Sequence, residues 1–248
     1  MDSHEYLKNY SKSFIDLIED KDFNFLTSNI KSEDLSPNAT TVVAVKYGQG
    51  IIMAGDRRAT QGNYIAHDDV IKVFRIDSTS MIGIAGSAAI AFELVKRFKT
   101  EVEHYEKIQN NKLTYNGKVN FLSTLIRSNL NLITQGLIVI PIFAGKSNDS
   151  FEINTFDAIG GSYNEKYFAS IGSGATMSNV YLQDNYIKPE RNDAIKLAIK
   201  SLKIASNNDS ATVGPSIEKN VSPNIYICDA NDVQALPDKE VMNFMKEI

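Results

Sequence analysis

The chain has 248 residues, 43% of them hydrophobic, and carries a formal net charge of −4. This length predicts one large domain or two modest ones, and no apolar run approaches the roughly 20 residues of a membrane span. Basic and acidic side chains balance after residue 39, so no basic surface for nucleic acid is expected. The single cysteine, Cys228, lies in a predicted buried strand, excludes an internal disulfide and is typical of a reducing cytoplasm.

Residues 1–39 form an acidic leader with four lysines and eight acidic side chains. Its polar start is followed by no apolar core, so we expect no secretory signal. Apolar residues at positions 14, 15, 17 and 18 predict a short amphipathic helix, and Pro37 favours a linker or turn over residues 31–38. The leader is therefore either an ordinary N-terminal arm or a propeptide that ends at Ala39.

After the leader, strand-like and helix-like patterns follow one another in groups. Strands are predicted at 41–47, 51–54, 71–76, 80–85, 137–144, 151–158, 167–171 and 221–229, and helices at 88–107, 118–135, 175–182, 191–206 and 238–246. Strands, two helices, strands and two helices indicate antiparallel sheet with helices layered outside it, an α+β sandwich. A regular alternation of single strands and helices, as in dinucleotide-binding folds, is not what this order shows.

Several common chemistries lack their sequence signals. The chain has no phosphate-binding glycine-rich loop and no dinucleotide fingerprint. Gly172-Ser173-Gly174 lacks the pattern of a nucleophile elbow, and His4, His67 and His104 lie among acidic or polar neighbours. No cluster has the spacing of zinc ligands. A Ser-His-Asp hydrolase and a metal centre are both poorly supported, and we expect no cofactor.

The threonine pair Thr40-Thr41 opens the first strand. An interior threonine hydroxyl has no base of its own, whereas a threonine made N-terminal by cleavage carries an amine and can become a nucleophile. Other small polar residues lie at turns. Ser173 fits the N-cap of a helix, and the segment Asp209–Thr212 fits a turn after a helix.

Lys72 allows two interpretations. On a strand it faces opposite to its apolar neighbours Ile71 and Val73. If that face is buried, its ammonium needs a carboxylate partner, and Asp56 at the end of an earlier strand is the nearest candidate. If the strand lies at a sheet edge, the lysine is simply solvated.

The residues also match a known family in order and spacing. The matching segments are Thr40-Thr41-Val42-Val43-Ala44, the run 54–62 with Gly55-Asp56, Lys72, the run 83–89 with Gly86-Ser87, Gly172-Ser173-Gly174 and Asp209-Ser210-Ala211-Thr212. Together they resemble a 20S proteasome β subunit, closest to the actinobacterial type. The resemblance covers essentially all of residues 40–248.

This resemblance implies the four-layer αββα sandwich of N-terminal nucleophile hydrolases, with residues 1–39 as a propeptide and 40–248 as the catalytic domain. Cleavage between Ala39 and Thr40 would make Thr40 the nucleophile of a threonine endopeptidase. The other implied roles fall on Lys72 as a positive charge, Asp56 as its holder, Ser173, Asp209 and Thr212 around the terminal amine, and the Gly86 backbone N–H as oxyanion donor.

The resemblance also implies a substrate site. Thr60, Gly86 and Ala88 would pair with an extended peptide backbone, and the first specificity pocket would be lined by Ala59, Val70, Ile84, Ala88 and Phe92. Because these pocket residues are apolar, we expect cleavage after hydrophobic residues. The chain departs from the family pattern at Ala39 and Val213, where glycine is usual, and at Thr212, where serine is common.

The partners implied are six more copies in a homo-heptameric β ring, α-subunit rings stacked on it, an ATPase unfoldase ring, and unfolded or tagged protein substrates in the cytoplasm. Three alternatives remain beside the active peptidase. They are an unprocessed structural ring subunit, the smaller heat-shock peptidase of the same superfamily, and an α-type ring subunit.

Overall fold

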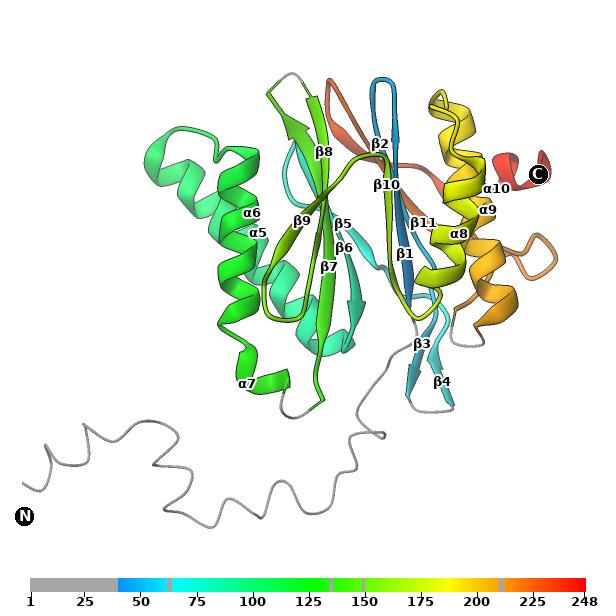
Figure 1. Cartoon of the computed structure of the whole chain (residues 1–248), viewed down its shortest axis with the longest axis horizontal. Helices are drawn as coiled ribbons and strands as arrows, with labels where there is room; N and C mark the ends of the chain where they lie inside the picture. The colour runs from blue at the N-terminus through cyan, green and yellow to red at the C-terminus, as the bar shows by residue number, and fades with distance from the viewer. Residues whose placement is uncertain (1–39, 62–63, 134–135, 149, 210–211) are drawn as a thin grey trace, which may run out of the picture.

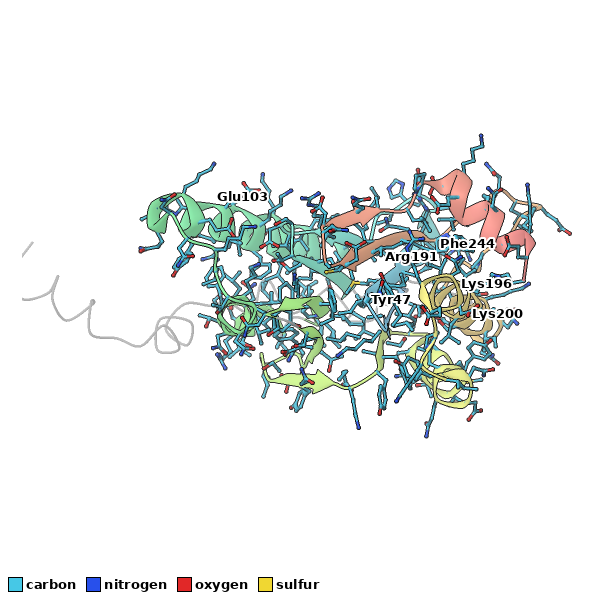
Figure 2. The ribbon with its side chains drawn as sticks, turned by 90° about the horizontal axis from the view of Figure 1, so that it is seen from above. Tyr47, Glu103, Arg191, Lys196, Lys200 and Phe244 are labelled. Atoms are coloured by element: carbon cyan, nitrogen blue, oxygen red, sulfur yellow. The ribbon has the colours of Figure 1, made fainter. Side chains whose placement is uncertain are left out.

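The computed structural model describes residues 40–61, 64–133, 136–148, 150–209 and 212–248. Two five-stranded antiparallel sheets face each other, and a layer of helices covers the outer face of each sheet (Figure 1). The expected four-layer αββα sandwich is confirmed. Figure 2 views the layers from above, with Glu103 on one helical layer and Lys196, Lys200 and Phe244 on the other.

The first sheet has the strand order β10-β1-β2-β11-β12. Its strands are β1 (Thr41–Tyr47), β2 (Gly50–Gly55), β10 (Phe168–Gly172), β11 (Asn224–Asp229) and β12 (Val233–Ala235). Three helices pack outside it: α8 (Ala175–Asn185), α9 (Arg191–Asn208) and α10 (Asp238–Lys246). Strand β1 lies between β10 and β2, and the register pairs Thr41 with Gly172 and Val42 with Gly55.

The second sheet has the order β5-β6-β7-β8-β9. Its strands are β5 (Val73–Arg75), β6 (Ser80–Gly86), β7 (Val139–Ser147), β8 (Ser150–Phe156) and β9 (Ser162–Glu165). Helices α5 (Ala88–Gln109) and α6 (Tyr115–Arg127) cover it, and the short α7 (Leu130–Ile133) follows α6. A separate hairpin, β3 (Ala59–Gln61) and β4 (Tyr64–His67), extends from the end of the first sheet.

Strand β1 is packed against other elements on both of its faces. Val43 and Val45 pack into the core under α8, α9 and α10, whereas Val42 and Ala44 pack into the core between the two sheets. All four side chains are fully buried. A strand buried on both faces reads in the sequence as a continuous apolar run rather than an alternating one, which is the pattern of residues 42–45.

The expected elements differ from the observed ones in a few places. One helix over 118–135 is wrong, because α6 begins three residues earlier, where the Thr114 hydroxyl accepts from Gly117 N–H at 3.1 Å, and ends at Arg127. The short strands β3, β4, β9 and β12 were not predicted. The amphipathic helix expected near residue 14 and the cleavage position at Ala39 lie outside the described residues. Within those residues, no helix is long and apolar enough to cross a membrane.

Candidate active site

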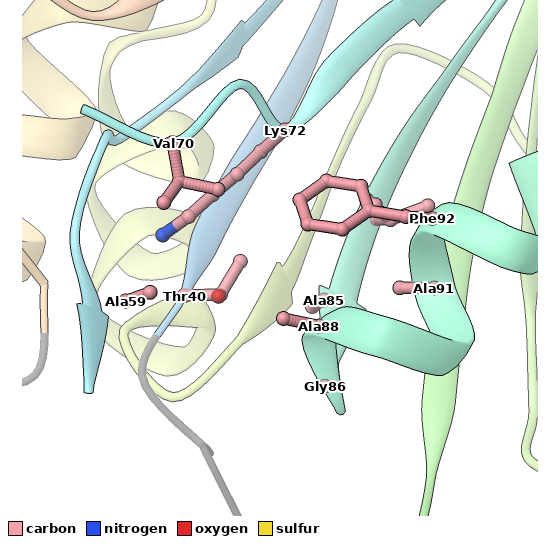
Figure 3. A pocket seen from close by; sticks show the side chains of 10 residues that line it. Thr40, Ala59, Val70, Lys72, Ala85, Gly86, Ala88, Ala91 and Phe92 are labelled. Carbon is pink, nitrogen blue, oxygen red and sulfur yellow. The ribbon is translucent and has the colours of Figure 1, made fainter. Parts of the chain in front are cut away.

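Thr40 lines an apolar pocket together with residues of β6 and α5. It directly precedes β1, and its carbonyl accepts a hydrogen bond from Ser173 N–H at 2.9 Å. The pocket is lined by Thr40, Ala59, Val70, Lys72, Ile84, Ala85, Gly86, Ala88, Ala91 and Phe92. Figure 3 shows the Lys72 ammonium pointing toward Thr40 and Ala59.

Lys72 and Asp56 form a buried ion pair beside Thr40. The ammonium lies 2.7 Å from Asp56 Oδ1, and it also donates to the Arg58 carbonyl. Lys72 is 3% exposed, so the interpretation of a solvated edge-strand lysine is wrong. The expected alternation also fails, because Lys72 precedes β5 and is buried together with Val73, while Ile71 is 46% exposed.

The Asp56 carboxylate is held by four donors. Oδ1 accepts from Thr41 N–H at 2.8 Å as well as from Lys72, and Oδ2 accepts from Arg58 N–H at 2.9 Å and Val213 N–H at 3.2 Å. Val213 stands where the family usually has glycine, yet it does not adopt a positive φ. The Val213 backbone N–H donates directly to the Asp56 carboxylate.

Burial lowers the pKa of Lys72, and the nearby Asp56 carboxylate partly opposes that shift by favouring the charged form. The backbone around the lysine is fixed from both sides. Ile84 N–H donates to the Lys72 carbonyl at 3.0 Å, and Val73 N–H donates to the Asn224 side-chain oxygen at 2.8 Å. A buried ammonium with a weakened hold on its proton is therefore kept at a fixed place next to Thr40.

Three polar side chains gather on the other side of Thr40. Ser173 Oγ and Thr212 Oγ1 both donate to Asp209 Oδ2, at 2.5 and 2.6 Å. Thr40 N–H in turn lies 3.4 Å from Ser173 Oγ. Ser173 does not cap α8, because the N-cap residue is Gly174 and no side chain caps that helix.

Gly86 closes the pocket at the turn from β6 into α5. Its φ of +112° belongs to glycine, and a Cβ at this position would lie 2.0 Å from the Ile138 carbonyl oxygen. The turn is tied down by Ser87 N–H, which donates to the same carbonyl at 2.8 Å. Only a glycine allows this close approach of two backbone segments.

The substrate-site residues expected from the sequence are mostly brought together. Ala59, Val70, Ile84, Ala88 and Phe92 all line the pocket. Phe92 is 40% exposed and packs edge-on against Phe74, with ring centroids 6.0 Å apart. Thr60 lies in β3, where its backbone pairs with Ile65, and its side chain is outside the description.

Sequence reasoning missed two supporting residues. Asn224 was not singled out, although its side chain fixes the backbone after Lys72. Thr41 was named only as part of the threonine pair and given no role, yet its side chain is fully buried and hydrogen-bonded to Thr212. Among the described residues, no group of three or more histidine, cysteine or acidic side chains is arranged to hold a metal ion.

Known proteins are similar to this chain over most of its length. The family model for the proteasome subunit matches residues 36–217. The proteasome subunit beta of Stackebrandtia nassauensis is 40% identical over 84% of this chain and 77% of that protein. The chain belongs to the proteasome β-subunit family. Further members of the family are the proteasome subunit beta of Acidothermus cellulolyticus, 42% identical over 86% of this chain and 76% of that protein, and that of Streptomyces griseus, 37% identical over 96% and 88%.

Membership in the proteasome β-subunit family confirms the resemblance found in the sequence, and the family is one of threonine endopeptidases. The relatives named above are beta subunits, which argues against an α-type ring subunit and against the smaller heat-shock peptidase.

Proposed function

We propose that this proteasome β subunit is a catalytic threonine endopeptidase that removes its own leader and then hydrolyses peptide bonds with Thr40. One observation supports the proposal most strongly. Thr40 is the residue at which an apolar pocket, the buried Lys72–Asp56 pair and the Ser173–Asp209 cluster meet. A residue with only a structural role at the start of a strand does not require this surrounding chemistry.

Self-cleavage creates the free Thr40 amine, which acts as the general base for peptide hydrolysis. Thr40 Oγ attacks the carbonyl of Ala39, the peptide bond breaks, and water hydrolyses the resulting ester. This leaves a carboxylate on Ala39 and a free amine on Thr40. In the mature chain that amine, directly or through a water, accepts the hydroxyl proton as Oγ attacks a substrate carbonyl, and later passes it to the leaving amine. Water then hydrolyses the acyl ester on Thr40.

The neighbouring groups make this proton transfer favourable. The Lys72 ammonium places positive charge beside the hydroxyl and lowers its affinity for the proton, while Asp56 holds that charge in position. Ser173, Asp209 and Thr212 orient the terminal amine. The Gly86 backbone N–H stabilises the negative charge that develops on the substrate carbonyl oxygen.

The pocket beside Thr40 selects substrates that place an apolar side chain before the cut bond. Its lining offers methyl groups and one aromatic ring, with Lys72 already occupied by Asp56. A charged substrate side chain would lose its hydration there without gaining a partner. Fluorogenic peptides ending in Leu or Tyr should therefore be cleaved faster than those ending in Arg or Asp, and a preference for a charged residue would refute this specificity.

Intact mass and N-terminal sequence of the purified protein test the proposal directly. A chain that begins at Thr40 supports self-cleavage, and a Thr40→Ala variant should retain residues 1–39 and lose hydrolysis. Thr40→Ser is the matched control, because it keeps the hydroxyl. Persistence of the leader in assembled particles, or hydrolysis by Thr40→Ala, would favour a structural subunit or another nucleophile.

The active form is a ring assembly in the cytoplasm. The relatives are subunits by name, and we extend this to seven copies of the chain in a β ring. Two such rings stack between α-subunit rings, and an ATPase unfoldase supplies unfolded or tagged proteins. Native mass spectrometry of the chain coexpressed with an α subunit tests the arrangement, and a monomer that hydrolyses peptides at the full rate would contradict it.

A further inference from the structure

The second residue of the threonine pair, Thr41, has its side chain inside the protein. It is 0% exposed and opens β1, and its hydroxyl makes two contacts. Gly174 N–H donates to Thr41 Oγ1 at 3.1 Å, and Thr41 Oγ1 lies 2.6 Å from Thr212 Oγ1. A Cβ on Gly174 would lie 2.4 Å from the Thr41 oxygen, so the fit around this hydroxyl is close.

The direction of these hydrogen bonds follows from counting protons. An ionised carboxylate only accepts, and each hydroxyl has one proton to donate. Thr212 uses its proton on Asp209 Oδ2, so the proton in the bond between the two threonines comes from Thr41. Ser173 likewise donates to Asp209, which leaves its oxygen to accept from the nitrogen of Thr40 at 3.4 Å.

Thr41 also contacts the second half of the site. Its backbone N–H donates to Asp56 Oδ1, the same oxygen that accepts from Lys72. Thr41 therefore contacts both halves of the site. Its backbone N–H donates to Asp56, which holds Lys72, and its hydroxyl contacts Thr212, which donates to Asp209.

A hydroxyl at this position needs a reason. The next residues, Val42 and Val43, are fully buried, and valine has nearly the shape of threonine. Burying a hydroxyl is unfavourable unless it is hydrogen-bonded, so a purely packing role would be served better by valine. The two contacts of the Thr41 hydroxyl supply the missing reason: Gly174 N–H holds its oxygen, and Thr212 connects it through Asp209 and Ser173 to the amine of Thr40.

We propose that Thr41 is a positioning residue for catalysis, whose hydroxyl donates to Thr212 and so strengthens and orients the hydrogen bond from Thr212 to Asp209, the carboxylate that Ser173 also binds. A well-placed Asp209 keeps the proton of Ser173, and the Ser173 oxygen then accepts from the Thr40 amine. The inference rests on the proposed function of Thr40 as nucleophile, and Thr41 touches neither substrate nor the reacting atoms.

Removing the hydroxyl should change chemistry more than binding. In Thr41→Val, Thr212 loses the donor that strengthens its own bond to Asp209. More of the negative charge on Asp209 then faces the amine, which keeps its proton to higher pH. The other charged groups that interact around the site are Lys72, Asp56 and Arg58, and the substitution itself adds or removes no charge.

Steady-state hydrolysis of a peptide ending in Leu tests this. For the processed Thr41→Val protein we expect kcat to fall by about tenfold through misorientation of the base, with KM unchanged. The acidic limb of the kcat profile should move to higher pH. Thr41→Ser should retain the parent values. Ser178→Ala, which removes a buried hydroxyl bonded to the Ser201 carbonyl at 3.2 Å, should leave kcat and the pH profile unchanged.

A parent-like kcat and pH profile in Thr41→Val would overturn the proposal. Should that variant not fold, Thr41→Ala takes its place beside Thr41→Ser, and equal kcat and pH profiles of that pair would overturn it too. A double variant with Thr212→Val should be no slower than Thr212→Val alone, and additive losses would contradict action through Thr212. Comparison of the parent with Thr40→Ala comes first. If no Thr40-dependent hydrolysis exists, the proposed function falls and this inference with it; otherwise only the inference is at stake.

Discussion

Replacing Asp56 by asparagine separates the charge of this residue from its shape. The carboxylate receives Thr41 N–H and Lys72 on one oxygen and Arg58 N–H and Val213 N–H on the other. An asparagine offers one oxygen and one NH2 group. In either orientation of the amide, its NH2 group would face two of the four donors, which would then have no acceptor.

The cost can be estimated from these contacts. Each buried N–H left without an acceptor costs about 1–3 kcal/mol, and removing one partner of a buried ion pair costs about 3–5 kcal/mol. These effects overlap, because Lys72 can release its proton once its carboxylate is gone; burial already lowers the pKa of this lysine. We expect Asp56→Asn to lose about 3–5 kcal/mol of unfolding free energy and nearly all peptide hydrolysis.

Urea denaturation measures the stability, and hydrolysis of a peptide ending in Leu measures the activity. Asp157→Asn is the matched control, because Asp157 also accepts from several donors, Gly161 N–H and Tyr163 among them, but lies on the surface. Adding Lys72→Met to Asp56→Asn should recover part of the stability and none of the activity. An Asp56→Asn protein within about 1 kcal/mol of the parent, with full hydrolysis, would refute this reasoning.

Three further predictions follow from other contacts. Gly86→Ala should abolish hydrolysis and lower the melting temperature, since its Cβ would meet the Ile138 carbonyl at 2.0 Å; parent-like activity would contradict the fixed turn. Although burial opposes it, the ion pair with Lys118 and neighbouring hydrogen bonds lower the pKa of Asp77 below 3.8. The stability this gives is present above pH 3.8 and is lost as pH falls through the folded-state value, so urea midpoints of Asp77→Asn should vary less below that pH than those of the parent. Burial raises the pKa of Cys228 to about 12, so a thiol reagent at neutral pH should label it only in urea; rapid labelling of the folded protein would contradict its burial.

Much of the architecture could be predicted because apolar residues follow clear helix-like and strand-like patterns along the sequence. Continuous apolar runs mark strands such as β1, whose residues are buried on both faces. Short strands escaped for a physical reason. Three-residue strands such as β3 and β12 pair through only a few residues each, and so few residues show no periodicity.

The proposed catalytic set could be named only through the family resemblance, since its members taken singly fit ordinary turns, caps or strand residues. The sequence did not show whether Lys72 is buried, because its burial depends on how one sheet packs on the other. The role of the Thr41 side chain could not be predicted from the sequence. Its hydroxyl is explained by Gly174 and Thr212, which lie far away along the chain and meet it only in the fold.

The residues proposed for bond cleavage and the residues that line the substrate pocket come largely from different elements of the fold. The proposed nucleophile Thr40 and the groups beside Asp209 lie at the start of β1 and at the ends of α8 and α9, whereas much of the pocket is supplied by strand β6 and helix α5, with Ala59 from β3. Side chains such as Ala59 and Phe92 can therefore change size without moving Thr40. Substrate preference can diversify in this scaffold while the bond-breaking chemistry stays constant, and redesign of the subunit for new substrates should begin on α5.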